Sequence, residues 1–229
     1  MADAAATHVR VNDGLTAAVE RRVLLWIARR LPEWVHSDHL TALGVVGTAT
    51  ASASFALARL FPVALVGVGL GLAVNWFGDS LDGTLARVRR QERPRYGYYV
   101  DHVLDICGVS ALMGGLAFSG YMSPLVALGV LVAYLLVSAE VFLATAVGGE
   151  FRLSFARLGP TELRLALSGA SLALLRWPEA DVPGLGRVLV MDIGGTVAAA
   201  GLLVVLVLSA CSMGWRLYQA ETRPIVARF

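Results

Sequence analysis

Hydrophobic positions along the chain are gathered into long runs, separated by short segments that contain charged residues, proline or glycine. A helix needs about 20 mostly apolar residues to cross a membrane, and most of these runs reach that length. We therefore predict an all-α integral membrane protein with six transmembrane helices. The fifth predicted span is shorter than the others and begins at a proline. The spans are residues 40–60, 63–87, 97–118, 124–147, 160–175 and 188–211.

The segment from Gly14 to Leu31 has a different pattern, because arginine and glutamate residues interrupt its apolar positions. It is too charged to span a membrane, and we predict an amphipathic helix that lies in the membrane interface. A soluble capping helix is the alternative. We expect a single domain over residues 1–229. Its parts are a tail with the interfacial helix (1–36), a six-span core (37–215) and a cytoplasmic tail (216–229).

Arginine residues are distributed unevenly between the two ends of this six-span arrangement. One end has the arginines of the interfacial helix, those of the loop around residues 87–95, and Arg152, Arg157, Arg164, Arg216, Arg223 and Arg228. The other end has Arg59, Arg176 and Arg187. Because cytoplasmic loops are enriched in positive charge, we predict both termini on the cytoplasmic side, in a bacterial inner membrane.

The overall composition agrees with this class of protein. Of the 229 residues, 57% are hydrophobic and 16% are charged, which is typical of a protein with several membrane spans. The formal net charge of +2 is too small to indicate a nucleic-acid partner. The composition therefore predicts the lipid bilayer, and no nucleic acid, as a partner.

Four aspartates stand out within the second and third predicted spans. Asp79 and Asp82 are three residues apart, and Asp101 and Asp105 are four apart, so each pair lies on one face of a helix. Carboxylates among apolar helices are costly unless cations compensate them. Oxygen-rich sites suit hard cations, so we predict a shared site for Mg²⁺ or Mn²⁺, with two ions between the two helices.

A site of this kind is suited to a substrate that carries phosphate. Two metal ions can clamp a diphosphate and stabilise charge on the attacked phosphorus and on the leaving group. Gly83 and Ala86 carry little side-chain bulk, so a ligand could approach the second span closely, and Arg87 could meet a phosphate. A carboxylate that the metal does not fully engage could accept a proton from an attacking hydroxyl.

The pattern Asp79-x2-Asp82-Gly83-x2-Ala86-Arg87, followed by Gly97-x3-Asp101-x3-Asp105, resembles the signature of the CDP-alcohol phosphotransferases. These are integral membrane enzymes of phospholipid synthesis. The resemblance implies that Asp79, Asp82 and Asp101 bind the metal ions, and that Asp105 is a metal ligand or the general base. It also implies a CDP site formed by Asp79, Asp82, Gly83, Ala86 and Arg87. An alcohol would attack the β-phosphorus of a CDP-linked donor and release CMP.

Two departures from the family pattern concern spacing and the start of the first span. Nine residues, 88–96, separate Arg87 from Gly97, where the family usually has eight, and we expect the loop to absorb the extra residue. Many members begin the first span with Pro-Asn-x-x-Thr, of which only Thr41 is present here. Small-residue stripes such as Gly44, Gly47 and Gly114-Gly115 allow a tight helix interface, and family analogy predicts a homodimer.

Four further polar residues near or within the spans have two interpretations each. His102 is turned from the Asp101 face by about 100° and either packs or takes part in catalysis. Glu140 lies deep in the fourth span and either contacts the acceptor or bonds to a neighbouring helix. Glu162 and Arg164 either form part of a helix start or contact a substrate headgroup. Asp192, near the opposite membrane face, is expected in solvent.

The sequence leaves the substrate open between two versions of this reaction. We prefer CDP-diacylglycerol as donor, with a small polar alcohol such as inositol phosphate, glycerol phosphate or serine as acceptor. The alternative is a choline/ethanolamine-type enzyme with a small CDP-alcohol donor and a lipid acceptor, which His102 favours. Two remoter alternatives are an intramembrane prenyltransferase and an ion transporter. Prenyltransferases of this kind lack the Gly-x2-Ala-Arg continuation that this sequence contains. A transporter would have its carboxylates near mid-membrane, whereas those of this sequence cluster near one face.

Overall fold

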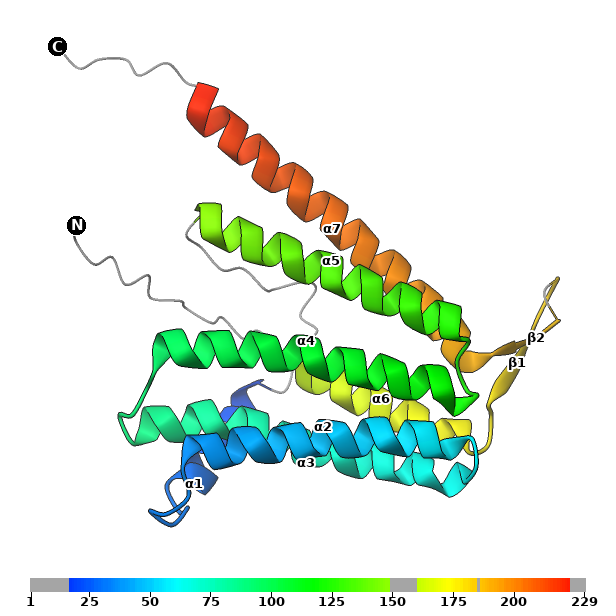
Figure 1. The fold of residues 1–229 in the computed structure, drawn as a ribbon, viewed down its shortest axis with the longest axis horizontal. Helices are drawn as coiled ribbons and strands as arrows, with labels where there is room; N and C mark the ends of the chain where they lie inside the picture. Colours follow the sequence, from blue (N-terminus) through cyan, green and yellow to red (C-terminus); the bar gives the residue numbers. More distant parts are fainter. Residues whose placement is uncertain (1–16, 149–159, 185, 223–229) are drawn as a thin grey trace.

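The computed structural model describes residues 17–148, 160–184 and 186–222. The chain forms a bundle of long helices with a small β-hairpin at one end (Figure 1). The helices are α1 (Ala17–Ala28), α2 (Ser37–Ala58), α3 (Leu65–Val88, after a 3-10 turn at Pro62–Ala64), α4 (Pro94–Ser119), α5 (Pro124–Gly148), α6 (Pro160–Leu174) and α7 (Val190–Thr222). The hairpin consists of β1 (Glu179–Val182) and β2 (Gly186–Leu189), which pair antiparallel. The expected all-α membrane class is confirmed.

Helices α2 and α3 approach each other so closely that their backbones touch. A Cβ atom on Gly78 would meet the backbone of Gly44 and Leu40, and one on Gly47 would meet the backbone of Asn75 and Gly71. Small residues permit such close packing of helices within a membrane. Because Gly44 and Gly47 face α3 of the same chain, they supply no surface for the expected homodimer.

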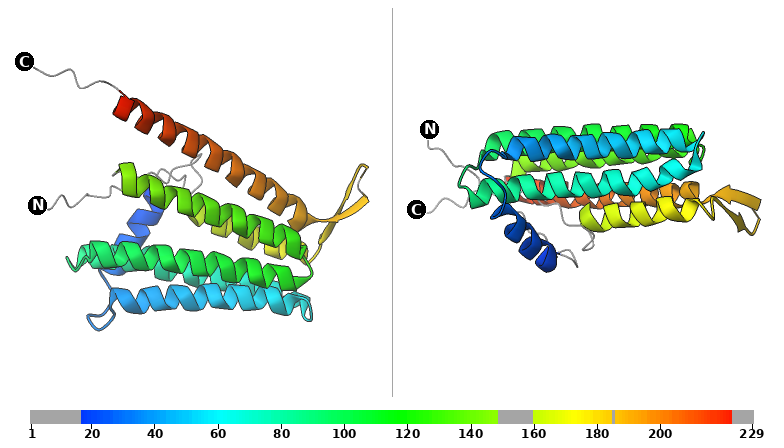
Figure 2. Two further views of the ribbon diagram at one scale, coloured as in Figure 1. Left: turned by 45° about the horizontal axis from the view of Figure 1, so that its top comes forward. Right: turned by 90° about the horizontal axis from the view of Figure 1, so that it is seen from below.

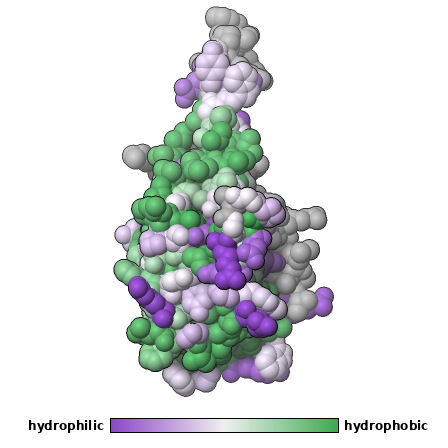
Figure 3. Space-filling view, turned by 90° about the vertical axis from the view of Figure 1, so that its right-hand side faces the viewer, coloured by the Kyte–Doolittle hydropathy of each residue, from purple (hydrophilic) through white to green (hydrophobic). Residues whose placement is uncertain are grey.

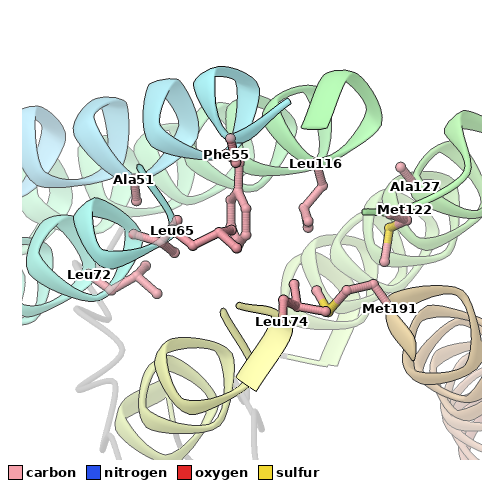
Figure 4. Packing of buried hydrophobic residues seen from close by; sticks show 11 residues of the cluster. Ala51, Phe55, Leu65, Leu72, Leu116, Met122, Ala127, Leu174 and Met191 are labelled. Carbon is pink, nitrogen blue, oxygen red and sulfur yellow. The ribbon is translucent and has the colours of Figure 1, made fainter. Parts of the chain in front are cut away.

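The apolar core lies between the helices at the end away from α1. Phe55 of α2, Leu65 of α3 and Leu116 of α4 are almost fully buried there. They belong to one cluster with Leu174 of α6 and Met191 of α7 (Figure 4). Every helix except α1 thus has a labelled residue in this cluster, and that of α5 is Ala127. This end holds the helices together while the opposite end carries the polar site.

Helix α1 packs across the other end of the bundle, against α3 (Figure 2). Leu24 and Ala28 of α1 are buried against Leu40, Leu81 and Leu85, which come from α2 and α3. The predicted amphipathic helix is therefore confirmed as a helix, with bounds inside the predicted segment. The predicted tail before Ala17 lies outside the described residues, as do Arg152, Arg157, Arg223 and Arg228.

Helix α7 pairs with α5 and diverges from the rest of the bundle (Figures 1 and 2). The predicted sixth span, 188–211, falls largely within this helix, which continues to Thr222 through the region predicted as a tail. An apolar run indicates which part of a helix is suited to the lipid. The helix itself can continue beyond that part when no proline intervenes. Asp192, which was expected in solvent, is half-buried and accepts hydrogen bonds from the Ser123 amide (2.6 Å) and hydroxyl (2.5 Å).

Helix α6 matches the bounds of the predicted fifth span to within one residue, but it is too short to cross a membrane alone. Helix α6 has 15 residues, or about 22 Å, whereas a membrane core is about 30 Å thick. Five helices of the described chain, not six, are long and apolar enough to cross a membrane. The segment after α6 forms the β-hairpin, in which Gly184 and Gly186 have positive φ angles of 83° and 75°. Hydrophilic residues gather near the middle of the hairpin end, with hydrophobic surface around them (Figure 3).

Candidate metal and phosphate site

Three of the four aspartates converge between α3 and α4. A carboxylate oxygen of Asp79 and one each of Asp101 and Asp105 lie within 4.8 Å of one another. Helix α2 packs against both α3 and α4, so it holds the two aspartate-bearing helices on either side of a common space. Three carboxylates at this separation repel one another, and oxygen donors are the ligands that Mg²⁺ and Mn²⁺ prefer. The donor set therefore fits a divalent cation.

Asp82, one turn after Asp79, is held by different contacts. Its Oδ2 atom accepts a hydrogen bond of 2.6 Å from the Thr41 hydroxyl, and its Oδ1 atom accepts one of 2.5 Å from the Gly83 amide. The Ser37 hydroxyl also donates to the Asp82 carbonyl oxygen at 3.0 Å. The first turn of α2 thus orients this carboxylate. Thr41, the single residue retained from the family's start to the first span, is part of the site.

Arg164 of α6 forms an ion pair with Asp79, with 2.6 Å between Nη2 and Oδ2. The exposed fractions of the two side chains are 16% and 29%. A carboxylate has two oxygens, so Arg164 on Oδ2 leaves Oδ1 available to a cation. The sequence indicated Arg164 as a candidate site residue but could not predict its partner. The structure places it beside Asp79, a predicted metal ligand.

Glu20 of α1 was not predicted as a site residue, yet it joins three helices. Its carboxylate accepts hydrogen bonds from Trp76 Nε1 (2.8 Å) and Ser80 Oγ (3.3 Å) of α3. It also accepts a hydrogen bond from the hydroxyl of Thr161, in the first turn of α6, which lies 3.1 Å from each carboxylate oxygen. One signal was present in the sequence: Glu20, Leu24 and Ala28 are spaced by four, which places Glu20 on the apolar face of α1.

The predicted Arg87 lies at a small cavity between α1 and α3. Its Nη2 atom bonds to Thr84 Oγ1 at 3.3 Å, and a Cβ atom on Gly83 would lie 3.9 Å from the guanidinium. The cavity has a volume of about 240 Å³ and is lined by Arg21, Leu25, Thr84, Arg87 and Val88. Arg21 of α1, predicted only as a surface charge, thus lines the same cavity as Arg87.

The loop between the two aspartate pairs absorbs the nine-residue spacing as expected. At the end of α3, the Gln91 amide donates to the Ala86 carbonyl oxygen (2.9 Å), and the Arg90 amide donates to the Arg87 carbonyl oxygen (3.2 Å). This is a Schellman turn, and Arg90 has the positive φ angle (54°) that glycine usually adopts there. Helix α4 then begins at Pro94, so the spacing within both aspartate pairs is helical.

Two arginines of this loop bind groups of the protein itself. Arg89 donates to the carbonyls of Leu31 (3.1 Å) and Pro32 (2.8 Å), in the segment between α1 and α2. Arg93 forms an ion pair with Asp38, which lies in the first turn of α2. The loop is thus fastened to the same turn of α2 that orients Asp82.

Comparison with known proteins identifies the family. A family model described as CDP-alcohol phosphatidyltransferase matches residues 34–210. The chain belongs to the CDP-alcohol phosphatidyltransferase family. No curated protein sequence matches the chain. Among solved structures, the phosphatidylinositol phosphate synthase of Mycobacterium tuberculosis with CDP-DAG bound is similar, with a TM-score of 0.53 and 23% sequence identity. The alignment covers 91% of this chain and 98% of that one, which shows a common fold.

This membership makes the chain a transferase of phosphate-containing groups in phospholipid synthesis. It sets aside the intramembrane prenyltransferase and the ion transporter. All eight positions of the family signature lie in α3 and α4. Gly97 is exposed in the first turn of α4, with no atom within 4 Å of the place that a Cβ would occupy.

The remaining predicted residues of this CDP-alcohol phosphatidyltransferase have packing or local contacts. The His102 ring packs on Tyr98, with 4.1 Å between centroids, and meets the edge of Phe142. Its Nδ1 atom lies 2.7 Å from the Tyr98 carbonyl oxygen. Glu140 accepts a hydrogen bond of 2.9 Å from Ser209 of α7, which is the helix contact that the sequence offered as one interpretation. Glu162 is an acidic residue in the first turn of α6.

Proposed function

We propose that this protein transfers a phosphatidyl group from CDP-diacylglycerol to a small polar alcohol and releases CMP. One observation carries the proposal: Asp79, Asp101 and Asp105 present carboxylate oxygens within 4.8 Å of one another, on helices that carry the complete family signature. The similar synthase of Mycobacterium tuberculosis contains CDP-DAG, which supports the choice of donor.

The metal would be held by carboxylates from both aspartate pairs. Asp79, Asp101 and Asp105 form the group of oxygens, and Asp82 would join from α3, oriented by Thr41. Mg²⁺ or Mn²⁺, as two ions, would neutralise the donor diphosphate and the charge that develops on its leaving group. Arg164 bonds to Asp79 from α6 and would keep that carboxylate in its orientation.

We assign proton removal to Asp105, which is exposed whereas Asp79 and Asp82 are half-buried. Its carboxylate would accept the proton of the acceptor hydroxyl as that oxygen forms a bond to the β-phosphorus. The bond from the β-phosphorus to the bridging oxygen breaks, and CMP leaves with the electron pair. Gly83 and Ala86 leave room for the nucleotide beside α3, and the guanidinium of Arg87 would attract its phosphates.

The choline/ethanolamine-type alternative was based on His102. The contacts of this ring with Tyr98 and Phe142 account for it by packing, and they do not favour a small CDP-alcohol as donor. CDP-diacylglycerol therefore stays the preferred donor, and the acceptor is to be found by experiment.

The test is an assay of CMP release by purified protein with radiolabelled CDP-diacylglycerol and single acceptors: inositol phosphate, glycerol phosphate and serine. We expect CMP and a labelled phospholipid with one acceptor, loss of both with a chelator, and recovery with Mg²⁺ or Mn²⁺. Parallel reactions contain CDP-choline or CDP-ethanolamine with diacylglycerol. CMP release only in those reactions would contradict the donor that we propose.

We also propose a molecular setting for this reaction. Residues 1–229 would form a single domain that crosses a bacterial inner membrane six times, with α6 and its flanking segments as the fifth crossing. The arginine distribution supports a position of the aspartates near the cytoplasmic face. Family analogy supports a homodimer.

A further inference from the structure

The carboxylate of Glu20 lies on the buried face of the helix that crosses the end of the bundle. Leu24 and Ala28, one and two turns along the same face, are 6% and 2% exposed. A carboxylate in such a position is costly unless donors satisfy it. Three donors do so, and they come from two other helices: Trp76 and Ser80 from α3, and Thr161 from α6.

These contacts and the Arg164–Asp79 ion pair join α3 and α6 at two neighbouring points. Ser80 follows Asp79 directly on α3, and Thr161 precedes Arg164 by three residues, which is about one turn of α6. Glu20 therefore binds both helices close to the residues through which α6 reaches the predicted metal ligand. Helix α6 is short, and Thr161 and Arg164 lie in its first two turns. A fixed first turn is what gives Arg164 a constant distance to Asp79.

We propose that Glu20 is a positioning residue for the metal site. It holds the first turn of α6 against α3, and so keeps Arg164 on Oδ2 of Asp79 with the other oxygen directed to the cation. This inference rests on the proposed metal-dependent function. It makes α1 part of the active-site framework as well as a membrane-surface helix.

The hydrogen bonds of the two Glu20 oxygens show which variants can distinguish this positioning role from an effect of the negative charge alone. Oε1 of Glu20 accepts from Trp76, Ser80 and Thr161, whereas Oε2 accepts from Thr161 alone. A glutamine with its carbonyl oxygen at the Oε1 position keeps all three donors, so Glu20→Gln is the conservative variant. Glu20→Ala removes every contact. Thr161→Val removes only the link to α6 and leaves α1 unaltered.

The experiment measures Mn²⁺ binding to the purified full-length protein by electron paramagnetic resonance, together with the Mn²⁺ dependence of CMP release. We expect the Mn²⁺ dissociation constant to rise about tenfold in Glu20→Ala, Thr161→Val and Arg164→Met, as for other residues that orient metal ligands. Glu20→Gln should stay within about twofold of wild type. The control is Glu92→Ala, at an exposed acid in the loop between α3 and α4.

A double variant tests whether Glu20 acts through Arg164. If it does, Glu20→Ala combined with Arg164→Met binds Mn²⁺ no more weakly than Arg164→Met alone. Multiplied effects would overturn the proposal, and so would wild-type affinity in Thr161→Val or in a folded Glu20→Ala. Wild-type protein that neither binds Mn²⁺ nor releases CMP would overturn the proposed function as well. Unchanged variants beside an active wild type would overturn only the role of Glu20.

Discussion

At the scale of single residues, the four aspartates differ in what surrounds them. Asp79 and Asp82 are half-buried and bonded to Arg164 and Thr41, whereas Asp105 is exposed one turn after Asp101. We predict that Asp105→Asn lowers the rate of CMP release by about 100-fold or more, because an amide cannot accept the acceptor's proton. Binding of CDP, measured by calorimetry, should remain detectable. The matched control is Asp181→Asn in the hairpin, and near-normal turnover of Asp105→Asn would refute its assignment as the base.

Thr41 permits a second residue-scale prediction. Its hydroxyl is the donor that orients Asp82 from α2, and a residue that orients a metal-binding carboxylate typically contributes tenfold or more. Thr41→Val should therefore lower kcat/KM for the CDP-linked donor by about tenfold. Thr41→Ser keeps the hydroxyl and should stay close to wild type. Equal losses in both variants would show that the methyl group matters and that the hydrogen bond does not.

At the scale of elements, the contact between α2 and α3 decides where the site residues lie. Gly78 lies one residue before Asp79 and faces the backbone of α2. Gly78→Ala should force the helices apart and lower the free energy of unfolding by about 1–3 kcal/mol, as overpacking does elsewhere. Thermal denaturation in detergent measures this change. Gly114→Ala on α4 is the control, because no atom lies within 4 Å of its Cβ position, and an equal loss there would contradict the packing argument.

At the scale of the whole molecule, one contact bears on the number of membrane crossings. Ser123, just before α5, bonds to Asp192 in the first turn of α7, so α5 and α7 begin at the same end of the bundle. The chain that leaves the far end of α5 must therefore return along the bundle before α7 begins. Helix α6 lies on this return path, although it is too short to span a membrane alone (Figure 1).

Cysteine labelling tests this topology. In a background with Cys107→Ser and Cys211→Ser, we predict that Asp181→Cys reacts with a membrane-impermeant maleimide on intact cells. Gln91→Cys should react only after the cells are permeabilised, because arginines surround it and favour the cytoplasmic side. Three crossings separate the two positions if α6 and its flanks traverse the membrane. Labelling of both from one side would leave two crossings and contradict the six-span proposal.

Most helices could be predicted because their cause is local. Within a membrane the backbone must satisfy its own hydrogen bonds, so long apolar runs predict helices. The predictions failed where another cause acted. Helix α7 extends past its apolar run to Thr222, and the polar segment after α6 forms a hairpin whose turns have glycines with positive φ angles.

For the site, the two aspartate pairs and their helical faces could be predicted from the sequence, because spacings of three and four residues place side chains on one face of a regular helix. The resemblance to the family rested on the eight positions of its signature, and the family model confirmed it. The residues that orient the aspartates became visible only in the packed structure: Thr41 on Asp82, Arg164 on Asp79, and Glu20 between α3 and α6. Arg164 is 85 positions from its partner, and Thr161 is 141 positions from Glu20. Periodicity determines the face on which a residue lies, but only the packing of the helices determines which distant residue meets it there.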